Sequence, residues 1–193
     1  MKKKMIILSA VVAIFIWGCD EIGENLNAVN CQFKIESIEN LSWAGIDLSN
    51  VTSAADLSLE DVQIAEDAIA NQDFDVNVSV NVSALNETES VAKIKGFDYV
   101  VLLDETELSS GQYDQETIVD PNGGIAILPI QMVFDATPLM ANGDMADMMN
   151  LVENIQNYSN DNFSELVIKF SPWLPLGDSI QKMPYITLTH SFQ

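Results

Sequence analysis

The sequence predicts a mainly β protein, an antiparallel β-sandwich of about seven or eight short strands with two short helices. Three observations support this expectation. Residues 74–84 alternate strictly between apolar and polar side chains, several shorter runs share that period, and turns containing proline or glycine separate them. The chain of 193 residues shows no strand–helix–strand repeat, so a parallel sheet is not expected.

The segment 74–84 is the clearest strand. Its apolar positions are Phe74, Val76, Val78, Val80, Val82 and Ala84, and only Asp, Asn and Ser lie between them. Successive side chains of a strand point to opposite faces, so the pattern predicts one buried face and one wet face. A slip of one residue would turn every valine to water, which fixes the register.

Shorter runs predict the other strands. They cover residues 31–35, 41–48, 97–103, 114–119, 125–134, 163–170 and 185–192. Pro129 inside one run predicts an edge position or a bulge, because proline cannot donate to a strand ladder. Turns are expected at 104–106 and 120–124, and the prolines at 172 and 175 favour a loop over 172–177.

Helical spacing appears in two segments. Residues 58–70 begin with Ser58 and Asp61 in the pattern of a capping box, and their apolar side predicts a helix across an open end of the sheet core. Residues 144–156 begin with Asp144 as a candidate N-cap. The methionines of this second segment recur at helical spacing, which favours a core role over a pliable binding face.

The N-terminus has the layout of a secretion signal. Three lysines precede an apolar run over residues 5–17, which is too short to span a bilayer, since spanning takes roughly 20 residues. The residues Ile16-Trp17-Gly18-Cys19 resemble a bacterial lipobox, which implies cleavage after residue 18 and a lipid on the Cys19 sulfur. We therefore expect a lipoprotein signal peptide over 1–18 and a lipidated tether over 19–30, with an ordinary secretory signal or an uncleaved helix as the alternatives.

Residues 31–193 are expected to form one domain with a strongly acidic surface. The formal charge is −21, and removal of the three lysines at positions 2–4 makes it −24. Such a surface repels phosphate backbones, so nucleic acid is not an expected partner, and it disfavours contact with anionic lipid headgroups. The acids are scattered along the chain rather than grouped in a tail.

Part of the chain resembles a known family. Residues 74–134 resemble the type 2 late-embryogenesis-abundant domain, also called the LEA14-like or water-stress domain. The matching features are the alternating strand, a polar turn at 85–90, a strand containing Tyr99, then Gly111, and the pair Gly123-Gly124 ahead of the next strand. The usual Asn-Pro-Asn of the first turn is replaced here by Leu85-Asn86-Glu87. The resemblance implies an immunoglobulin-like sandwich without a catalytic site.

No residue pattern marks an active site or a cofactor site. His190 is the only histidine, and it is expected at a core edge. Cys31 is expected to be a small buried residue on a strand. A zinc site would need several His or Cys ligands, and neither acidic turn has the pattern of a calcium loop. A weak calcium site built from converging acids stays open.

Trp173, between two prolines, is either a plug at the end of the sandwich or an exposed aromatic that contacts a ligand.

These observations predict a non-enzymatic lipoprotein of the bacterial cell envelope, anchored in the outer membrane through Cys19, with the leaflet left open. Its body would act as a binding or structural module linked to stress, with an envelope protein or a glycan as partner. One alternative is an accessory lipoprotein that binds a glycan or a peptide through Trp173. Another is an envelope hydrolase that uses two unmarked carboxylates.

Overall fold

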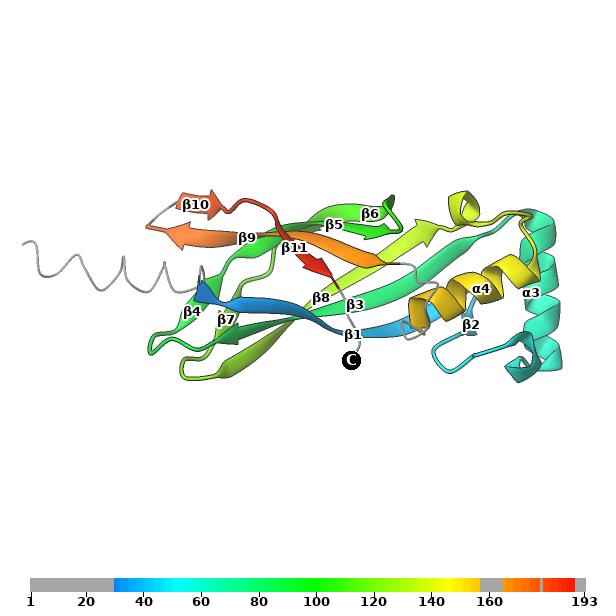
Figure 1. The fold of residues 1–193 in the computed structure, drawn as a ribbon, viewed down its shortest axis with the longest axis horizontal. Coiled ribbons are helices and arrows are strands. Elements are labelled where there is room, and N and C mark those ends of the chain that lie inside the picture. The colour runs from blue at the N-terminus through cyan, green and yellow to red at the C-terminus, as the bar shows by residue number, and fades with distance from the viewer. Residues whose placement is uncertain (1–29, 157–164, 178, 190–193) are drawn as a thin grey trace, which may run out of the picture.

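The computed structural model describes residues 30–156, 165–177 and 179–189. Within these residues the chain forms an antiparallel β-sandwich with two helices at one end (Figure 1). One layer has the strand order β2-β1-β3-β8, and the other has β10-β9-β5-β6 with β11 also paired to β9. The predicted fold class is confirmed. The described residues contain eleven strands, because short strands border the expected ones.

The first layer is built around the strand that the alternation predicts. β3 (Asp75–Asn86) pairs with β1 (Gln32–Trp43) on one side and with β8 (Gly124–Asp135) on the other. β8 is the edge of this layer, so the edge position expected from Pro129 is confirmed. β2 (Ile46–Asp47) returns from β1 through a turn at Ala44 and Gly45, both at positive φ.

The outward face of β3 is less wet than its sequence suggests. Ser79 and Ser83 are buried although they lie on the polar side of the strand. Asn81 Nδ2 donates to Ser37 Oγ at 3.0 Å, and Asn40 Nδ2 donates to Ser79 Oγ at 3.3 Å. Side chains of β1 thus cover part of this face.

The second layer contains the main departure from the sequence prediction. β5 (Gly96–Leu103) pairs with β6 (Thr106–Tyr113) through a turn at Asp104 and Glu105, as expected. β9, however, runs from Leu166 to Leu176, so the predicted loop over 172–177 is wrong. β10 (Ser179–Lys182) and β11 (Ile186–Thr189) pair with β9 one after the other, and β10 was not expected.

Neither proline of β9 leaves a backbone acceptor of the ladder without a donor. In an antiparallel strand the N–H and C=O of a residue point to the same side. Pro172 accepts from Met183 N, in the gap between β10 and β11. On the other side of β9, Trp173 O accepts from Lys95 N. Pro175, two residues farther on, faces that same side but lies beyond Gly96, where β5 begins. An N–H at 172 would face Met183 O, and that carbonyl accepts from Ser171 Oγ at 2.5 Å instead. The Ser171 hydroxyl thus replaces the donor that Pro172 lacks.

A small third sheet closes one end of the sandwich. β7 (Thr117–Val119) is shorter than the predicted strand over 114–119, and it pairs with β4 (Ala92–Ile94), which the sequence did not indicate. The turn that follows β7 has Asn122 and Gly123 at positive φ, in agreement with the predicted turn.

Both helices lie at the other end. α3 (Leu59–Asn71) stands across that end, and Ser58 and Asp61 form the expected capping box (Figure 1). Asp144 directly precedes α4 (Met145–Gln156), and its Oδ1 accepts from Asp147 N at 3.0 Å. Met148 is fully buried, which confirms a core role for this residue. No helix in the described parts of the chain has the length and apolarity needed to cross a bilayer.

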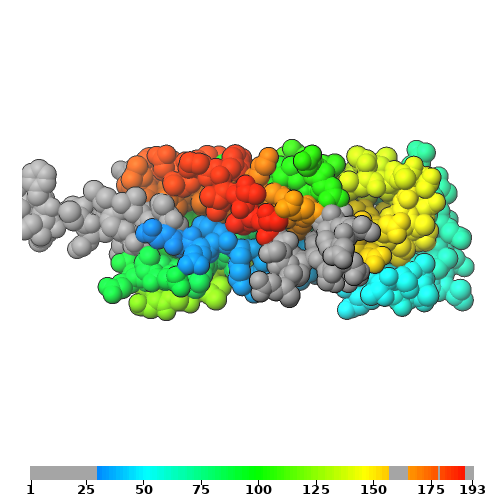
Figure 2. All heavy atoms as spheres, viewed as in Figure 1, coloured from blue at the N-terminus to red at the C-terminus, as the bar shows by residue number. Residues whose placement is uncertain are grey.

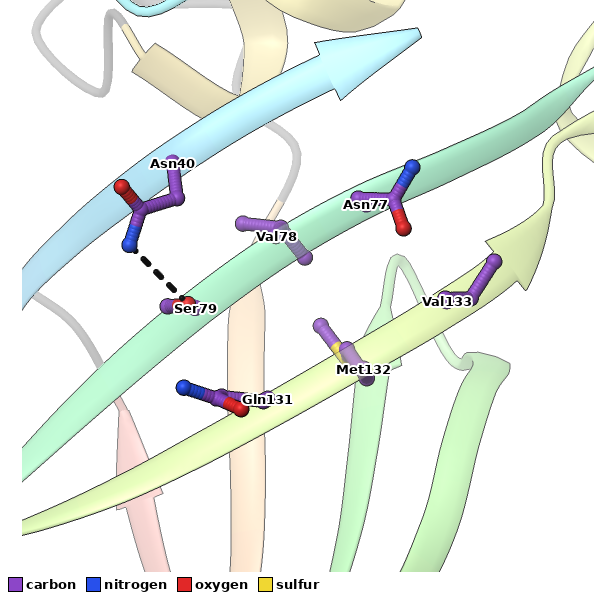
Figure 3. Close-up of a pocket in the computed structure, with 7 residues that line it drawn as sticks. All are labelled: Asn40, Asn77, Val78, Ser79, Gln131, Met132 and Val133. Carbon is purple, nitrogen blue, oxygen red and sulfur yellow. Dashed lines mark hydrogen bonds between the residues drawn. The ribbon is translucent and has the colours of Figure 1, made fainter. Parts of the chain in front are cut away.

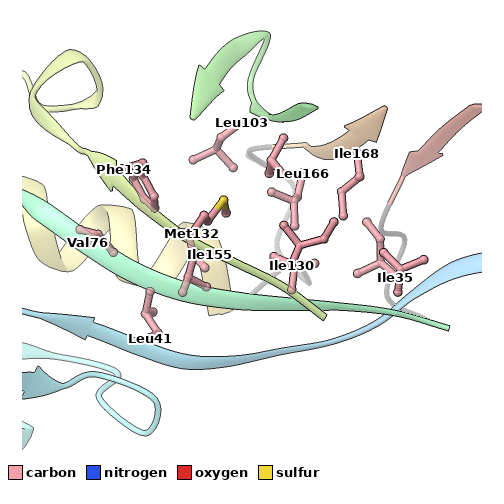
Figure 4. Packing of buried hydrophobic residues seen from close by; sticks show 14 of the residues in the cluster. Ile35, Leu41, Val76, Leu103, Ile130, Met132, Phe134, Ile155, Leu166 and Ile168 are labelled. Carbon is pink, nitrogen blue, oxygen red and sulfur yellow. The ribbon is translucent and has the colours of Figure 1, made fainter. Parts of the chain in front are cut away.

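The core fills the space between the two layers and extends under α4. Figure 4 shows side chains from β1, β3 and β8 facing Leu103, Leu166 and Ile168 of the second layer, with Ile155 of α4 beside them. Phe33 of β1 lies 4.9 Å from Phe170 of β9, and Phe97 lies 4.7 Å from the same ring. Aromatic contacts of this kind add about 0.5–1.5 kcal/mol each beyond area burial.

Candidate functional site

One hollow lies along the seam where the edge strands β6 and β8 of the two layers approach each other. It has a volume of about 390 Å³, and its walls are uncharged. The lining consists of Tyr99, Gln112, Tyr113, Gln115, Pro129, Ile130 and Gln131. Tyr113 stacks on Phe97 at 4.9 Å, and its hydroxyl donates to Gln115 Oε1 at 3.3 Å, so the core fixes the ring and the ring orients the amide.

The close fit of Tyr99 in this seam depends on a glycine. Gly111 lies opposite Tyr99 in the β5–β6 ladder, and a Cβ on Gly111 would come within 2.8 Å of the Tyr99 hydroxyl oxygen. The absence of a side chain at 111 therefore lets the tyrosine reach the edge of β6. This contact gives a structural reason for a glycine at position 111, within β6.

A second hollow, of about 380 Å³, lies on the outer face of the first layer (Figure 3). It is lined by Asn40, Asn77, Val78, Ser79, Gln131, Met132 and Val133. Asn40 has a positive φ of 55°, in the stretch of β1 where the register with β3 shifts between Glu39 and Ser42. This bulge places the Asn40 amide over Ser79, with Gln131 on the neighbouring strand.

The two hollows meet at Gln131, which lines both. Together they form a band of amide side chains, Asn40, Asn77, Gln131, Gln112 and Gln115, which we call the amide band. Among the residues that the structure describes, no Asp, Glu or Lys lines either hollow, although the chain carries 29 acidic residues. Gln112 is hydrogen-bonded to Asp98 and Asn40 donates to Ser79, but an amide has two donors and an acceptor, so the band suits a neutral ligand rich in hydroxyl or amide groups.

Trp173 lies in a different place and has little surface to offer a ligand. Its side chain packs over Gly96 in β5, and the residue is only 8% exposed. The indole Nε1 donates to Asp98 Oδ2 at 2.9 Å, and Lys182 Nζ lies 4.3 Å from the ring centroid. Trp173 is thus buried, as a plug would be, but it lies on the outer face of the second layer rather than at the end of the sandwich.

Asp98 joins the parts of this cluster. Its other oxygen, Oδ1, accepts from Lys182 Nζ at 3.0 Å. Burial alone would raise the pKa of Asp98, but the hydrogen bonds from Lys182 and Trp173 outweigh it and hold the pKa below its ordinary value. The cluster thus ties β5, β9 and β10 together on the outer face of the second layer.

The other residues singled out from the sequence divide into two groups. Cys19, with the predicted signal and nearly all of the tether, and His190 lie outside the described residues. Cys31 is buried at the start of β1, as expected, and burial raises the pKa of its thiol. Among the described residues no group of three His, Cys, Asp or Glu side chains is placed to hold a metal ion.

The amide band is a site that sequence reasoning missed. Its members come from β1, β3, β6 and β8 and the loop after β6, and they are far apart in the chain. Asparagine and glutamine are common on wet strand faces, so no spacing distinguishes them. Two signals were available: the two tyrosines and three glutamines between residues 99 and 131, and the lack of acids beside Gln131.

No family model and no curated protein matches this chain. Among solved structures, a protein from Archaeoglobus fulgidus is similar with 12% identity and a TM-score of 0.38, covering 82% of this chain and 96% of that chain. A late embryogenesis abundant protein solved in solution has 8% identity and a TM-score of 0.37, covering 95% and 87%. Both are distant likenesses in fold.

Proposed function

We propose that this protein is a lipid-anchored module of the bacterial cell envelope that binds a neutral glycan along the amide band and performs no chemistry on it. The anchor is supported by the lipobox-like residues that end at Cys19, and the type 2 late-embryogenesis-abundant kinship by the strand pattern over 74–134. The binding role rests on one observation: two uncharged hollows joined at Gln131 on a chain of charge −21.

The chemistry of the band favours a sugar. Tyrosine rings present flat apolar faces to the C–H face of a sugar ring, and amide side chains both donate to and accept from its hydroxyls. Tyr99 and Tyr113 supply the rings, and Gln115 and Gln131 supply the amides, while the Gln112 amide is already hydrogen-bonded to Asp98. Within the described part of the chain no carboxylate lines the hollows, so the band as described offers no general acid or base for hydrolysis.

The direct test has two parts. Intact mass of the mature protein should show cleavage before Cys19 and added acyl chains. Calorimetric titration with neutral oligosaccharides should show binding that weakens about tenfold in Gln131→Ala, since losing one or two hydrogen bonds costs about 1.4 kcal/mol. Gln63→Ala, an exposed glutamine on α3, is the matched control and should bind as the parent does. Equal affinities for the two variants, or no binding by the parent, would refute the proposal.

One observation favours a second candidate, a peptide ligand. β6 and β8, which border the seam, are both edge strands among the described residues, and an edge strand can accept an added strand. A peptide bound in that way depends on its backbone, so N-methylation of alternate peptide bonds should abolish its binding. A glycan ligand has no such dependence, which separates the two candidates.

A further inference from the structure

We propose that one end of the body rests on the zwitterionic headgroup layer of the membrane, while the helical end points away into water. We call the first end the tether end and define it by five exposed side chains, Ile118, Ile125, Ile127, Leu176 and Ile180. The inference rests on the proposed anchor at Cys19 and adds an interaction surface and an orientation to it.

Strand register places these side chains where the chain enters the fold. Gln32 at the start of β1 pairs with Leu85, which pairs with Ile125 of β8. The contact between Phe33 and Phe170 sets the middle of β9 at the same level, so Leu176 lies six residues farther out. Figure 2 shows the blue start of the described chain beside β9 and β10 (orange and red) and the green β4 region, opposite the helices (cyan and yellow).

Exposed apolar side chains gather at this end. Among the described residues, five of the nine large apolar side chains that remain exposed belong to it, with exposures between 47% and 64%. Leu176 and Ile180 flank the turn between β9 and β10, and Ile118, Ile125 and Ile127 border the turn between β7 and β8. Apolar side chains on two turns that point the same way can enter the boundary between headgroups and acyl chains.

The charges are also divided between the ends. Of the five lysines after residue 30, Lys34, Lys93, Lys95 and Lys182 lie toward the tether end. Three of them form ion pairs with acids there: Lys34 with Glu36 at 2.8 Å, Lys182 with Asp98 at 2.9 Å, and Lys95 with Glu116. Glu87, Glu89, Asp114 and Asp120 are further acids of this end, so its described residues carry four lysines against seven acids, a charge of −3. This end is therefore only weakly acidic, and a zwitterionic surface tolerates that charge.

The helical end has the opposite character. α3 and α4 carry Glu60, Asp61, Glu66, Asp67, Asp147 and Glu153 and contain no lysine. Such a surface is repelled by phosphates and remains in water. The overall acidity that argues against membrane contact is thus concentrated away from the anchor.

The chain geometry makes the orientation both possible and measurable. Residues 19–29 reach at most about 40 Å when extended, so the tether permits contact but does not force it. Gln32 and Trp43, at the two ends of β1, are about 36 Å apart at about 3.3 Å per residue. The predicted mature chain retains only two tryptophans, Trp173 toward the tether end and Trp43 beside α3.

These tryptophans are natural reporters of height above the membrane. The full lipidated protein is reconstituted into phosphatidylcholine vesicles that carry a dansyl group on a fraction of the headgroups, after intact mass has verified the lipid. Energy transfer to dansyl from Trp173, in Trp43→Phe, should be several-fold greater than transfer from Trp43, in Trp173→Phe. The double variant Leu176→Ser/Ile180→Ser should lower the transfer from Trp173. Leu59→Ser, which removes an exposed leucine from α3, should leave it unchanged.

Each of these measurements supports or overturns the proposed orientation. Equal transfer from the two tryptophans, or an unchanged signal in the double variant, overturns the orientation while leaving the anchor and the glycan site in place. A mature chain without lipid overturns the anchor, and the orientation with it. Hydrogen exchange on the unaltered protein covers the case of a tryptophan variant that fails to fold: vesicles should protect residues 174–182 and leave α3 unprotected, and the reverse pattern also overturns the proposal.

Discussion

β3 and β9 are the central strands of the two layers, and they are held in different ways. β3 pairs with β8 along its whole length without a shift and with β1 through two bulges. β9 pairs continuously with β5, but its other side is divided between β10 and β11. A strand with an unbroken ladder on one side, such as β3, can be predicted from its alternation. A strand whose partner on one side is interrupted, such as β9, can contain prolines, and its sequence then looks like a loop.

Burial explains why the alternation is lost in β9. Residues 170–175 are all buried, on both faces of the strand. The inner face packs in the core, and the outer face is covered by the Trp173 ring, Lys182 and Asp98. In β3 only parts of the outer face are covered, so its valines still alternate with small polar residues.

The largest expected effect is that of a charge on the inner face of β3. Val78 is buried in the core, and Val78→Asp should abolish cooperative unfolding, because an unpaired buried charge costs several kcal/mol, comparable with the stability of a domain. Asn77→Asp, one residue away on the exposed face, is the control and should shift the urea midpoint little. A cooperatively unfolding Val78→Asp protein would refute the assigned faces of β3.

Proline substitutions test the difference between the ladders most directly. Asn81 has a partner on each side, so Asn81→Pro should lower the free energy of unfolding by about 3 kcal/mol or more. The reverse change in β9, Pro172→Ala, restores an N–H opposite Met183 O, which already accepts from Ser171 Oγ, and should cost less than about 1 kcal/mol. Urea unfolding measures both, and similar losses would contradict the account of the interrupted ladder.

A side chain at Gly96, in β5, should clash with neighbouring atoms. A Cβ there would lie 2.3 Å from Tyr113 O and 2.7 Å from Trp173 Cε3, so Gly96→Ala should lower the free energy of unfolding by about 1–3 kcal/mol. The near-ultraviolet signal of Trp173 should change as well. Gly177→Ala meets no neighbouring atom within 4 Å but lies at a φ of 58°, so it measures the backbone strain at a turn glycine without a steric clash.

The smallest effect concerns the pH dependence of the Asp98 cluster. Because the folded-state pKa of Asp98 is lowered, its contribution is present above the unfolded pKa of about 3.9 and is lost as pH falls through the folded value. Asp98→Asn should therefore cost about 1 kcal/mol at pH 7, and the gap between variant and parent should close below about pH 4. Glu66→Gln, which removes an acid from the exposed side of α3, is the matched control at pH 7.

The sequence predicted the local elements well where one physical rule dominated. The alternation placed β3, the capping box placed the start of α3, and Pro129 placed β8 at an edge. It missed β4 and β10, which are short and gain their stability from pairing rather than from a pattern of their own. The amide band was also beyond it, since five strand and loop positions meet there only after the layers pack.

The mainly β body, the two helices and the inward face of β3 are predictable from the chain alone, because these follow from side-chain periodicity within a dozen residues. Only the tertiary structure decided that residues 172–176 form a strand and that Trp173 is buried against Asp98 and Lys182. It also decided which exposed side chains share one end of the body. Such features depend on partners far away in the chain, and a local pattern carries no information about a partner that packing alone brings near.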